Sequence, residues 1–321
     1  MIPDELQQET IKIVYSKLFP HIKKTPLIKS WPLINDIFDT NLFFKMEFLQ
    51  HAGTFKARGA INNVLNLDEE KKQKGITAVS AGNHAIAASY AANKFGLKNK
   101  IFMYNSANQF RVNKCKELKA NLYFTDPHSA FKDVLKASSE EGFSFIHPFD
   151  GAFTMQGTAT LGFEICNQMQ NIDNIIISVG GGGLIGGIGS FVKQKFPKCK
   201  IIGVEPEGAK GLTDSLKINK PIEQVLINSI ADSLSAPLHM PYSFSICQNV
   251  IDQMITVTDN EMIEAMLFMY DKCKLMLEPA CVAGVAALQR YFKGKLKNQD
   301  TLIVLCGSNI DIKSWNDLVF N

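Results

Sequence analysis

The sequence predicts an α/β fold with two open, mostly parallel twisted sheets and flanking helices. Short apolar runs of strand character alternate with helical patterns along most of the chain, which is typical of crossover connections between parallel strands. Nine such runs are many for one sheet of the usual size, so we expect two sheets, with the chain leaving one and returning to it. The 321 residues, 46% hydrophobic and 20% charged, suffice for one large domain or two ordinary ones.

The expected strands can be placed along the chain. They lie at residues 42–46, 76–80, 100–105, 121–125, 143–147, 174–179, 200–205, 254–258 and 301–306. Segments with apolar residues at helical spacing, such as HAIAASYAANKF and TDNEMIEAMLFMYDK, stand between most of them. Four prolines interrupt the pattern within residues 206–253, where we expect irregular segments and short helices that cover a site.

The charge pattern and the cysteines exclude several classes of function. Lys and Arg number 34 against 31 Asp and Glu, a net charge of +3 without a long single-sign run, so we expect a small-molecule ligand and no nucleic acid. The seven cysteines are scattered without a CxxC pair, which argues against a disulfide framework or a zinc site and for a reducing cytoplasm. The N-terminal MIPDELQQET has no apolar run, so no secretory signal is expected.

One uncharged stretch, residues 174–192, is long enough to cross a bilayer. It contains seven glycines, four of them consecutive, and each glycine costs a helix roughly 1 kcal/mol relative to alanine. We therefore expect a strand, a tight loop and a short helix in this stretch, and no membrane span.

The segment HAGTFKARGA places Lys56 in the first turn of an expected helix that begins near Phe55, with Thr54 as a cap. Desolvation and the partial positive charge of a helix N-terminus both disfavour an ammonium group and lower its pKa, which prepares an amine for a Schiff base. Gly59 within the helix indicates that another segment packs closely there. The alternative is an ordinary surface lysine beside Arg58.

A run of glycines, Gly180 to Gly183, stands between an expected strand and a helix that begins near Leu184. Converging backbone N–H groups and the positive end of the helix suit a bound phosphate. The same stretch matches G-x-G-x-x-G, and Glu205 ends the next strand about 20 residues later, which is also the pattern of a dinucleotide-binding loop. A structural turn without a ligand is the third interpretation.

Two further loops follow expected strands. The segment Ser80 to His84 offers backbone N–H groups, a hydroxyl and an amide at a helix start, which together suit a carboxylate. A loop that is only capped by Asn83 is the simpler alternative. Cys306 ends the strand at 301–306, at the edge where open α/β sheets place ligands, although an isolated cysteine there is usually a buried core thiol.

Taken in order, these segments resemble the fold type II pyridoxal-phosphate enzymes, whose fold is similar to the tryptophan synthase β chain, and specifically the serine/threonine dehydratase and serine racemase group. The resemblance runs from about Thr25 to Asn309. Its motifs are Lys45-Met46-Glu47, Gly53 to Ala60, Ser80 to His84, His147 to Asp150, Gln156 to Thr158, Gly180 to Gly183, Ala231 to Ser233, Glu278-Pro279 and Cys306 to Asn309. The family implies a large cofactor-binding domain of residues 1–66 and 152–321 and a small domain of residues 75–150.

The resemblance implies pyridoxal 5'-phosphate as the cofactor, with Lys56 carrying it as a Schiff base and acting as the catalytic residue. The residues that would bind the cofactor are Phe55, Lys56, Asn83, Gly180, Gly181, Gly182, Gly183, Leu184 and Cys306. Those that would bind the substrate are Ser80, Ala81, Gly82, Asn83 and His84. By the same resemblance the four glycines hold the cofactor phosphate, Asn83 reaches the ring hydroxyl, and Cys306 faces the pyridine nitrogen.

Departures from the family pattern bear on the outcome of the reaction. Ala81 stands where serine racemases carry a serine that acts as the acid and base on the opposite face, so racemisation is disfavoured. Cys306 replaces the commoner serine, and because a neutral thiol does not keep the pyridine nitrogen protonated, elimination is favoured. For a cation the family offers Glu205 and a carbonyl at about Ala209, but Gly211 replaces a further acid, so a divalent metal is in doubt and a monovalent ion stays open.

We therefore expect a cytoplasmic, homodimeric pyridoxal-phosphate lyase that deaminates L-threonine or L-serine to the 2-oxo acid and ammonia. The pocket for the β-substituent is expected within residues 206–253 and around Phe149. Within the family, the alternatives are a serine racemase and a β-replacement enzyme. Outside it, they are a nicotinamide-dependent oxidoreductase, which leaves Lys56 and Cys306 unexplained, and a catalytically silent ligand-binding relative.

Overall fold

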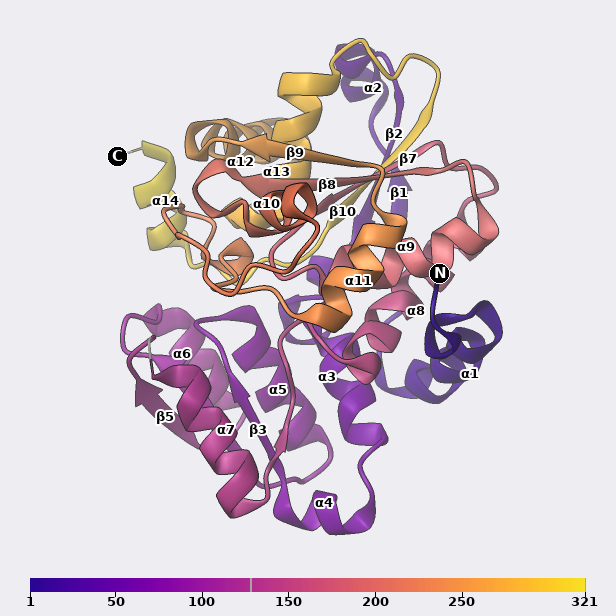
Figure 1. The fold of residues 1–321 in the computed structure, drawn as a ribbon. Helices are drawn as coiled ribbons and strands as arrows, with labels where there is room; N and C mark the ends of the chain where they lie inside the picture. The colour runs from indigo at the N-terminus through magenta and orange to yellow at the C-terminus, as the bar shows by residue number, and fades with distance from the viewer. Residues whose placement is uncertain (128, 321) are drawn as a thin grey trace.

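The computed structural model of the chain describes residues 1–127 and 129–320 and contains two β-sheets with helices packed around them (Figure 1). The larger sheet consists, in spatial order, of β1 (Leu27–Lys29), β2 (Asn41–Met46), β10 (Asp300–Leu305), β7 (Asn174–Ser178), β8 (Lys200–Pro206) and β9 (Gln253–Val257). The smaller sheet consists of β5 (Leu122–Thr125), β4 (Asn99–Tyr104), β3 (Ile76–Val79) and β6 (Ser144–Phe145). Its strands all pair in parallel, and in the larger sheet only β1 pairs antiparallel, with β2. The predicted α/β fold with two mostly parallel sheets is confirmed.

We call the smaller sheet with its helices the small lobe and the rest of the chain the large lobe; Figure 1 shows the small lobe below the large one. The helices of the small lobe are α4 (Glu69–Lys74), α5 (Asn83–Lys94), α6 (Gln109–Glu117) and α7 (Ala130–Glu141). Those of the large lobe are α1 (Gln8–Leu18), α2 (Pro32–Phe38), α3 (Lys56–Leu65), α8 (Ala152–Gln168), α9 (Gly183–Lys195), α10 (Gly211–Ile218), α11 (Pro241–Val250), α12 (Asp259–Cys273), α13 (Pro279–Ala287) and α14 (Ile312–Phe320). Short turns complete the chain: η1 (Asp4–Leu6), η2 (Phe19–His21), η3 (Glu47–Leu49), η4 (His51–Gly53), η5 (Glu207–Ala209), η6 (Asp232–Leu234) and the π turn η7 (Leu288–Phe292).

The nine predicted strands all form, with ends that differ by one or two residues. The tenth, β1, was missed because it has only three residues and lies at the antiparallel edge of the sheet, where no crossover helix signals it. The proline-rich stretch 206–253 contains η5, α10, η6 and α11 joined by irregular chain, as expected. Among the described residues no helix is both long enough and apolar enough to cross a membrane.

The close crossing of α3 and α8 explains the glycine that was expected to mark a tight contact. A Cβ on Gly59 would lie 3.2 Å from the carbonyl oxygen of Thr154, and one on Gly157 would lie 2.6 Å from the Gly59 backbone nitrogen. Because neither position has room for a side chain, the backbones of the two helices approach each other closely. This contact fixes the helix that begins with Lys56.

A cluster of buried charges fixes the other side of α3; we call Lys45, Glu47, Arg58 and Glu164 the closed cluster. The Arg58 guanidinium donates two hydrogen bonds to Glu47, both 2.8 Å, and two to Glu164, at 2.9 and 3.0 Å. Lys45 Nζ donates to the second Glu164 oxygen at 2.8 Å. All four side chains are at most 1% exposed, so two positive and two negative charges balance without solvent.

Candidate active site

Lys56 lies at the start of α3 with its side chain partly buried. Its Nζ donates a hydrogen bond of 2.8 Å to the Pro148 carbonyl oxygen and lies 5.0 Å from the centre of the Phe55 ring. Burial lowers the pKa of Lys56 to about 8, although Cys306 and Glu278 act in the opposite direction. An amine with that pKa is about 10% unprotonated at pH 7, whereas an ordinary lysine is unprotonated roughly once in 2,500. Lys56 is therefore a partly buried amine that is neutral in part of the population, and it is not an ordinary solvated surface lysine.

Lys56 faces a cavity of about 680 Å³. The nine residues predicted to bind the cofactor all line it: Phe55, Lys56, Asn83, Gly180, Gly181, Gly182, Gly183, Leu184 and Cys306. Phe55 and Cys306 are joined by a 3.0 Å hydrogen bond from the Phe55 N–H to the Cys306 carbonyl oxygen. The Cys306 thiol itself donates only a weak hydrogen bond, 3.7 Å long, to the Ala280 carbonyl oxygen. Residues separated by up to 251 positions thus line a single cavity.

The four glycines form a tight turn between β7 and α9. Gly182 has φ +91°, a backbone conformation that favours glycine. A Cβ on Gly181 would lie 2.1 Å from the Phe149 ring, and one on Gly183 would lie 2.4 Å from the Phe149 carbonyl oxygen. No side chain caps the first turn of α9, so its backbone N–H groups are available to an anion. The turn and the helix end together form a cradle for a phosphate-sized group.

A second space of about 590 Å³ adjoins the first and also reaches Lys56. All five residues predicted to bind the substrate line it: Ser80, Ala81, Gly82, Asn83 and His84. Ser80 Oγ accepts a 3.0 Å hydrogen bond from the Gly82 N–H, and α5 begins at Asn83 without a side-chain cap. The loop therefore presents a second helix N-terminus without a side-chain cap. Like the glycine turn, it lies next to Lys56.

His84 has a structural role in this loop. Its Nε2 lies 2.8 Å from the Ile146 carbonyl oxygen, and burial, followed by the charge of Lys56, lowers its pKa to about 3. The ring is therefore neutral at physiological pH. It ties the start of α5 to the chain leaving β6.

A polar network surrounds the Asn83 side chain, whose partners come from the large lobe. Its Nδ2 donates to Glu278 Oε1 at 2.6 Å and to Ser233 Oγ at 3.1 Å, while its Oδ1 accepts from Asn309 Nδ2 at 2.6 Å. Glu278 also accepts from the Asn309 N–H at 2.9 Å. Burial raises the pKa of Glu278, and the nearby Arg111 opposes that rise. The network holds the small lobe against the large lobe beside the second space.

Arg111 and Asp232 complete this network; with Glu278 we call them the open cluster. Arg111, on α6, forms ion pairs with Asp232 and, at 3.5 Å, with Glu278. Arg111 was not predicted as a site residue, because α6 also carries Lys116 and Glu117 and the sequence alone does not distinguish Arg111 from such solvated charges. Asp232 and Glu278 were part of the family motifs, but without an assigned role.

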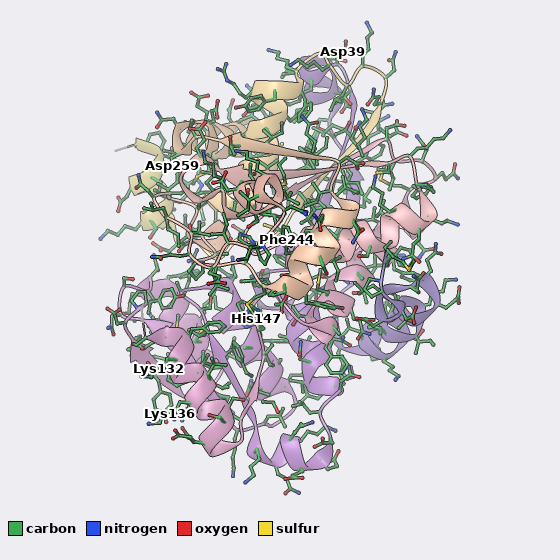
Figure 2. The ribbon with its side chains drawn as sticks, viewed as in Figure 1. Asp39, Lys132, Lys136, His147, Phe244 and Asp259 are labelled. Carbon is green, nitrogen blue, oxygen red and sulfur yellow. The ribbon has the colours of Figure 1, made fainter. Side chains whose placement is uncertain are left out.

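Two buried polar atoms at the first cavity have no hydrogen-bond partner among the described residues: His147 Nε2 and Ser178 Oγ. His147 Nδ1 accepts from the N–H groups of Phe149 and Asp150, at 3.3 and 2.9 Å, which places the ring proton on Nε2. Burial, and then Lys56, lower the pKa of His147 to about 3. Figure 2 shows His147 where the two lobes meet. Ser178 was missed as a site residue, although a hydroxyl at the end of the apolar run NIIISV was a signal.

Both oxygens of Glu205, the side chain proposed for a cation beside the Ala209 carbonyl, already accept hydrogen bonds. Glu205 Oε1 accepts from the Leu212 N–H at 2.8 Å, and Oε2 accepts from the Thr213 N–H and hydroxyl at 2.8 and 2.6 Å. Gly211 supplies no side chain, and no group of three or more metal-binding side chains occurs within residues 1–127 and 129–320. Burial raises the pKa of Glu205 to about 7, although the hydrogen bonds from Thr213 and Leu212 oppose that rise. The Glu205 side chain caps the start of α10.

Comparison with known proteins places these observations in a family. The family model for pyridoxal-phosphate dependent enzymes matches residues 18–307. A phenylserine dehydratase from Ralstonia pickettii is 40% identical over 298 residues, which cover 90% of this chain and 91% of that protein. A serine racemase from Arabidopsis thaliana is 34% identical and covers 96% of this chain and 94% of its own length. The solved structure of the processed form of threonine deaminase isoform 2 from Solanum lycopersicum aligns with a TM-score of 0.91 at 32% identity, covering 98% of this chain and 92% of that one.

Proposed function

Because the chain belongs to the family of pyridoxal-phosphate-dependent enzymes, we propose that it is an ammonia-lyase that converts a 3-hydroxy-α-amino acid to the 2-oxo acid and ammonia. L-Threonine and L-serine are the substrates that we propose first. The observation that carries the proposal is the position of Lys56, a partly buried amine with a lowered pKa that borders both a phosphate cradle and an uncapped helix N-terminus.

The lining of the first cavity fits pyridoxal 5'-phosphate. The glycine turn and the uncapped start of α9 would hold the phosphate, and Lys56 would hold the aldehyde carbon. Asn83 and Cys306 would face the ring hydroxyl and the ring nitrogen, and the orphaned Ser178 Oγ and His147 Nε2 are polar atoms that a polar ligand would satisfy. When bound, the cofactor stabilises negative charge at the substrate Cα.

Lys56 is the group that moves protons in this proposal. Released by the incoming amino group, its Nζ is neutral in part of the population at neutral pH and takes the proton from the substrate Cα. The Pro148 carbonyl oxygen, 2.8 Å from Nζ, orients the amine within the cavity. The hydroxyl group on the substrate Cβ would then leave as water with the proton that Lys56 had removed from Cα, and the enamine product would react with one water to give the 2-oxo acid and ammonia.

The loop from Ser80 to His84 binds the substrate α-carboxylate at the start of α5 in this proposal. Ala81 offers no hydroxyl to return a proton to the opposite face of Cα, and His84 is neutral and bonded to the Ile146 carbonyl oxygen. Both features support elimination over racemisation. Cys306 supports it further, because a cysteine at this position does not strengthen the cofactor as an electron sink in the way a carboxylate would.

An aryl-substituted substrate is a second candidate, favoured by the apolar side of the second space. This side is formed by Val79, Tyr104, Pro148, Phe149, Ala236 and Pro237. An apolar wall of this kind suits an aryl group, and a 40% identical relative is a phenylserine dehydratase. We therefore include 3-phenylserine among the substrates to be tested. Ala236 and Pro237 lie in the stretch where the β-substituent pocket was expected.

Spectroscopy followed by a product assay tests the proposal. The purified protein, supplied with pyridoxal phosphate, should show a visible absorption band that borohydride reduction fixes onto Lys56 in a peptide map. L-Threonine, L-serine or 3-phenylserine should then yield a 2-oxo acid and ammonia, with D-serine measured in parallel. Lys56→Ala should abolish both signals, and Lys132→Ala, on the surface of α7 in Figure 2, should change neither. A loaded protein that releases no 2-oxo acid from any of the three would refute the proposal.

Two further properties belong to the proposal. We expect the enzyme to be a homodimer and to act in the cytoplasm, as the resemblance to the dehydratases implies. Light scattering of the loaded protein should give about twice the chain mass of 35.7 kDa. A monomeric mass would reject the dimer and leave the proposed reaction untouched.

A further inference from the structure

Arg111 reaches from α6 of the small lobe to three acceptors on the large lobe. Its Nε donates to the Asn309 carbonyl oxygen at 2.9 Å, and one terminal nitrogen reaches Glu278 Oε2 at 3.5 Å. The other terminal nitrogen, Nη1, donates to Asp232 Oδ2. The guanidinium is therefore held at three points, all across the junction between the lobes.

The two carboxylates that face Arg111 differ sharply in exposure. The Glu278 side chain is 1% exposed and is also bound by Asn83 and Asn309, so it has no route to water. The Asp232 side chain is 51% exposed. If its contact with Arg111 is broken, the Asp232 carboxylate can turn to solvent and regain hydration, because half of its side chain is already exposed. Glu278 and Asn309 hold Arg111 in place, while Asp232 can be exchanged.

The exchangeable nitrogen of Arg111 lies beside the loop that binds the substrate carboxylate. A Cβ on Gly82 would be 2.6 Å from Nη1. Gly82 directly precedes α5, whose first turn has no side-chain cap. Among the described residues that line the second space, Lys56 and Arg111 are the only cations, and Lys56 is assigned to the cofactor. An anion at the start of α5 therefore has one positive partner within reach that is not assigned to the cofactor, the Arg111 guanidinium.

We propose that Arg111 binds the α-carboxylate of the amino-acid substrate, and that Asp232 occupies this position in the substrate-free enzyme as a built-in competitor. Binding exchanges one carboxylate for another on Nη1 and releases Asp232 to water, while Glu278 and Asn309 keep the guanidinium fixed. The proposal rests on the proposed function only in taking the ligand to be an α-amino acid.

Two single substitutions should change ligand affinity in opposite directions. Arg111→Met removes the positive partner and should weaken binding about tenfold or more, the range for a hydrogen bond to a charged group. Asp232→Asn removes the competing charge and should tighten binding severalfold. Arg111→Lys keeps the charge without the planar fork and should fall between Arg111→Met and the natural protein. If Arg111 and Asp232 were only a latch between the lobes, the two substitutions would weaken binding together.

The measurement is a titration of the cofactor-loaded protein with L-alanine, followed by the change in the visible absorption band. L-Alanine has no leaving group on Cβ, so its dissociation constant can be read even if the ammonia-lyase assay gives no product. Failure of the proposed function and failure of this inference are therefore distinguishable.

Control variants separate a local effect from a fold defect. Lys193 and Asp252 form an ion pair of 2.6 Å that lines neither cavity, and Asp252→Asn should leave the L-alanine dissociation constant unchanged. The double variant Arg111→Met with Asp232→Asn should bind as weakly as Arg111→Met alone, because the competitor no longer has a site to occupy. An unchanged affinity in Arg111→Met, or a weakened one in Asp232→Asn with full cofactor loading, would overturn the proposal.

Discussion

The closed cluster and the open cluster each place one buried arginine against two carboxylates, but they differ in the solvent exposure of those carboxylates. In the closed cluster both carboxylates, Glu47 and Glu164, are at most 1% exposed, and each binds Arg58 through two short hydrogen bonds. In the open cluster Glu278 is buried but Asp232 is half exposed, and the contacts cross between lobes. The same pairing of arginine with two carboxylates thus gives fixed ion pairs in the closed cluster and one exchangeable ion pair in the open cluster.

This difference shows what solvent access does to an ion pair. A charge without access to water has no alternative partner, so removing its counter-ion leaves a large uncompensated penalty. A charge at the surface regains hydration when its partner leaves. The closed cluster is accordingly suited to fixing α3 behind Lys56, and the open cluster is suited to admitting a ligand in front of it.

The largest effect is expected from breaking the closed cluster. Arg58→Met should lower the free energy of unfolding by about 3–5 kcal/mol, because it leaves Glu47 and Glu164 buried with only Lys45 to balance them. Arg111→Met is the matched comparison. It should cost clearly less, because Asp232 is exposed and burial already raises the pKa of Glu278, which can take up a proton.

Urea unfolding of both variants at one cofactor concentration would measure this contrast. The ratio of the two losses matters more than either value. Equal losses, or a larger loss in Arg111→Met, would mean that exposure does not distinguish the two clusters, and the comparison would fail.

The two sheets and most residues of the cavity could be predicted from the sequence, whereas the ion pairs of the open cluster could not. Alternating strands and helices gave both sheets, and the glycine run, Lys56 and Cys306 could be placed on one edge because parallel strands end together. The open cluster could not be predicted, because Arg111 lies 121 positions from Asp232 and no local sequence pattern links the two residues. Ion pairs between lobes leave no periodic signal, so only the three-dimensional structure reveals them.

Glu205 is a buried carboxylate outside both clusters. Its hydrogen bonds come from backbone N–H groups and a hydroxyl of α10, and not from an arginine. Burial raises its pKa from the ordinary 4.5 to about 7. A carboxyl group whose pKa is raised on folding contributes stability that is present below pH 4.5 and is lost as the pH rises through about 7. The loss is on the order of 3 kcal/mol at pH 8.

Glu205→Gln should therefore unfold with less pH dependence between pH 5 and 8 than the natural protein, and should be the more stable of the two at pH 8. Thermal unfolding across this range would measure it. Magnesium or manganese should raise the unfolding temperature of neither protein, since both Glu205 oxygens already accept hydrogen bonds. A metal-dependent rise that vanishes in Glu205→Gln would show that the carboxylate is a ligand after all.

The smallest effect concerns Lys56, which the open cluster influences and the closed cluster does not. Burial lowers the pKa of Lys56 to about 8, while Cys306 and Glu278 raise it. The rate at which the cofactor-free protein takes up pyridoxal phosphate onto Lys56 should rise with pH and reach half its maximum near 8, because only the neutral amine reacts. Glu278→Gln should move that midpoint downward by less than about one pH unit, on the order of 1 kcal/mol.

Asp232→Asn is the control for this last shift, because Asp232 faces Arg111 and is not among the groups that act on Lys56. It should leave the midpoint where it is while changing the affinity for L-alanine. If both substitutions moved the midpoint equally, Glu278 and Asp232 would act on Lys56 together. The separate roles proposed for the exchangeable Asp232 and the fixed Glu278 would then be wrong. If only Glu278→Gln moves the midpoint, the buried carboxylate tunes the amine and the exposed one controls access to the site.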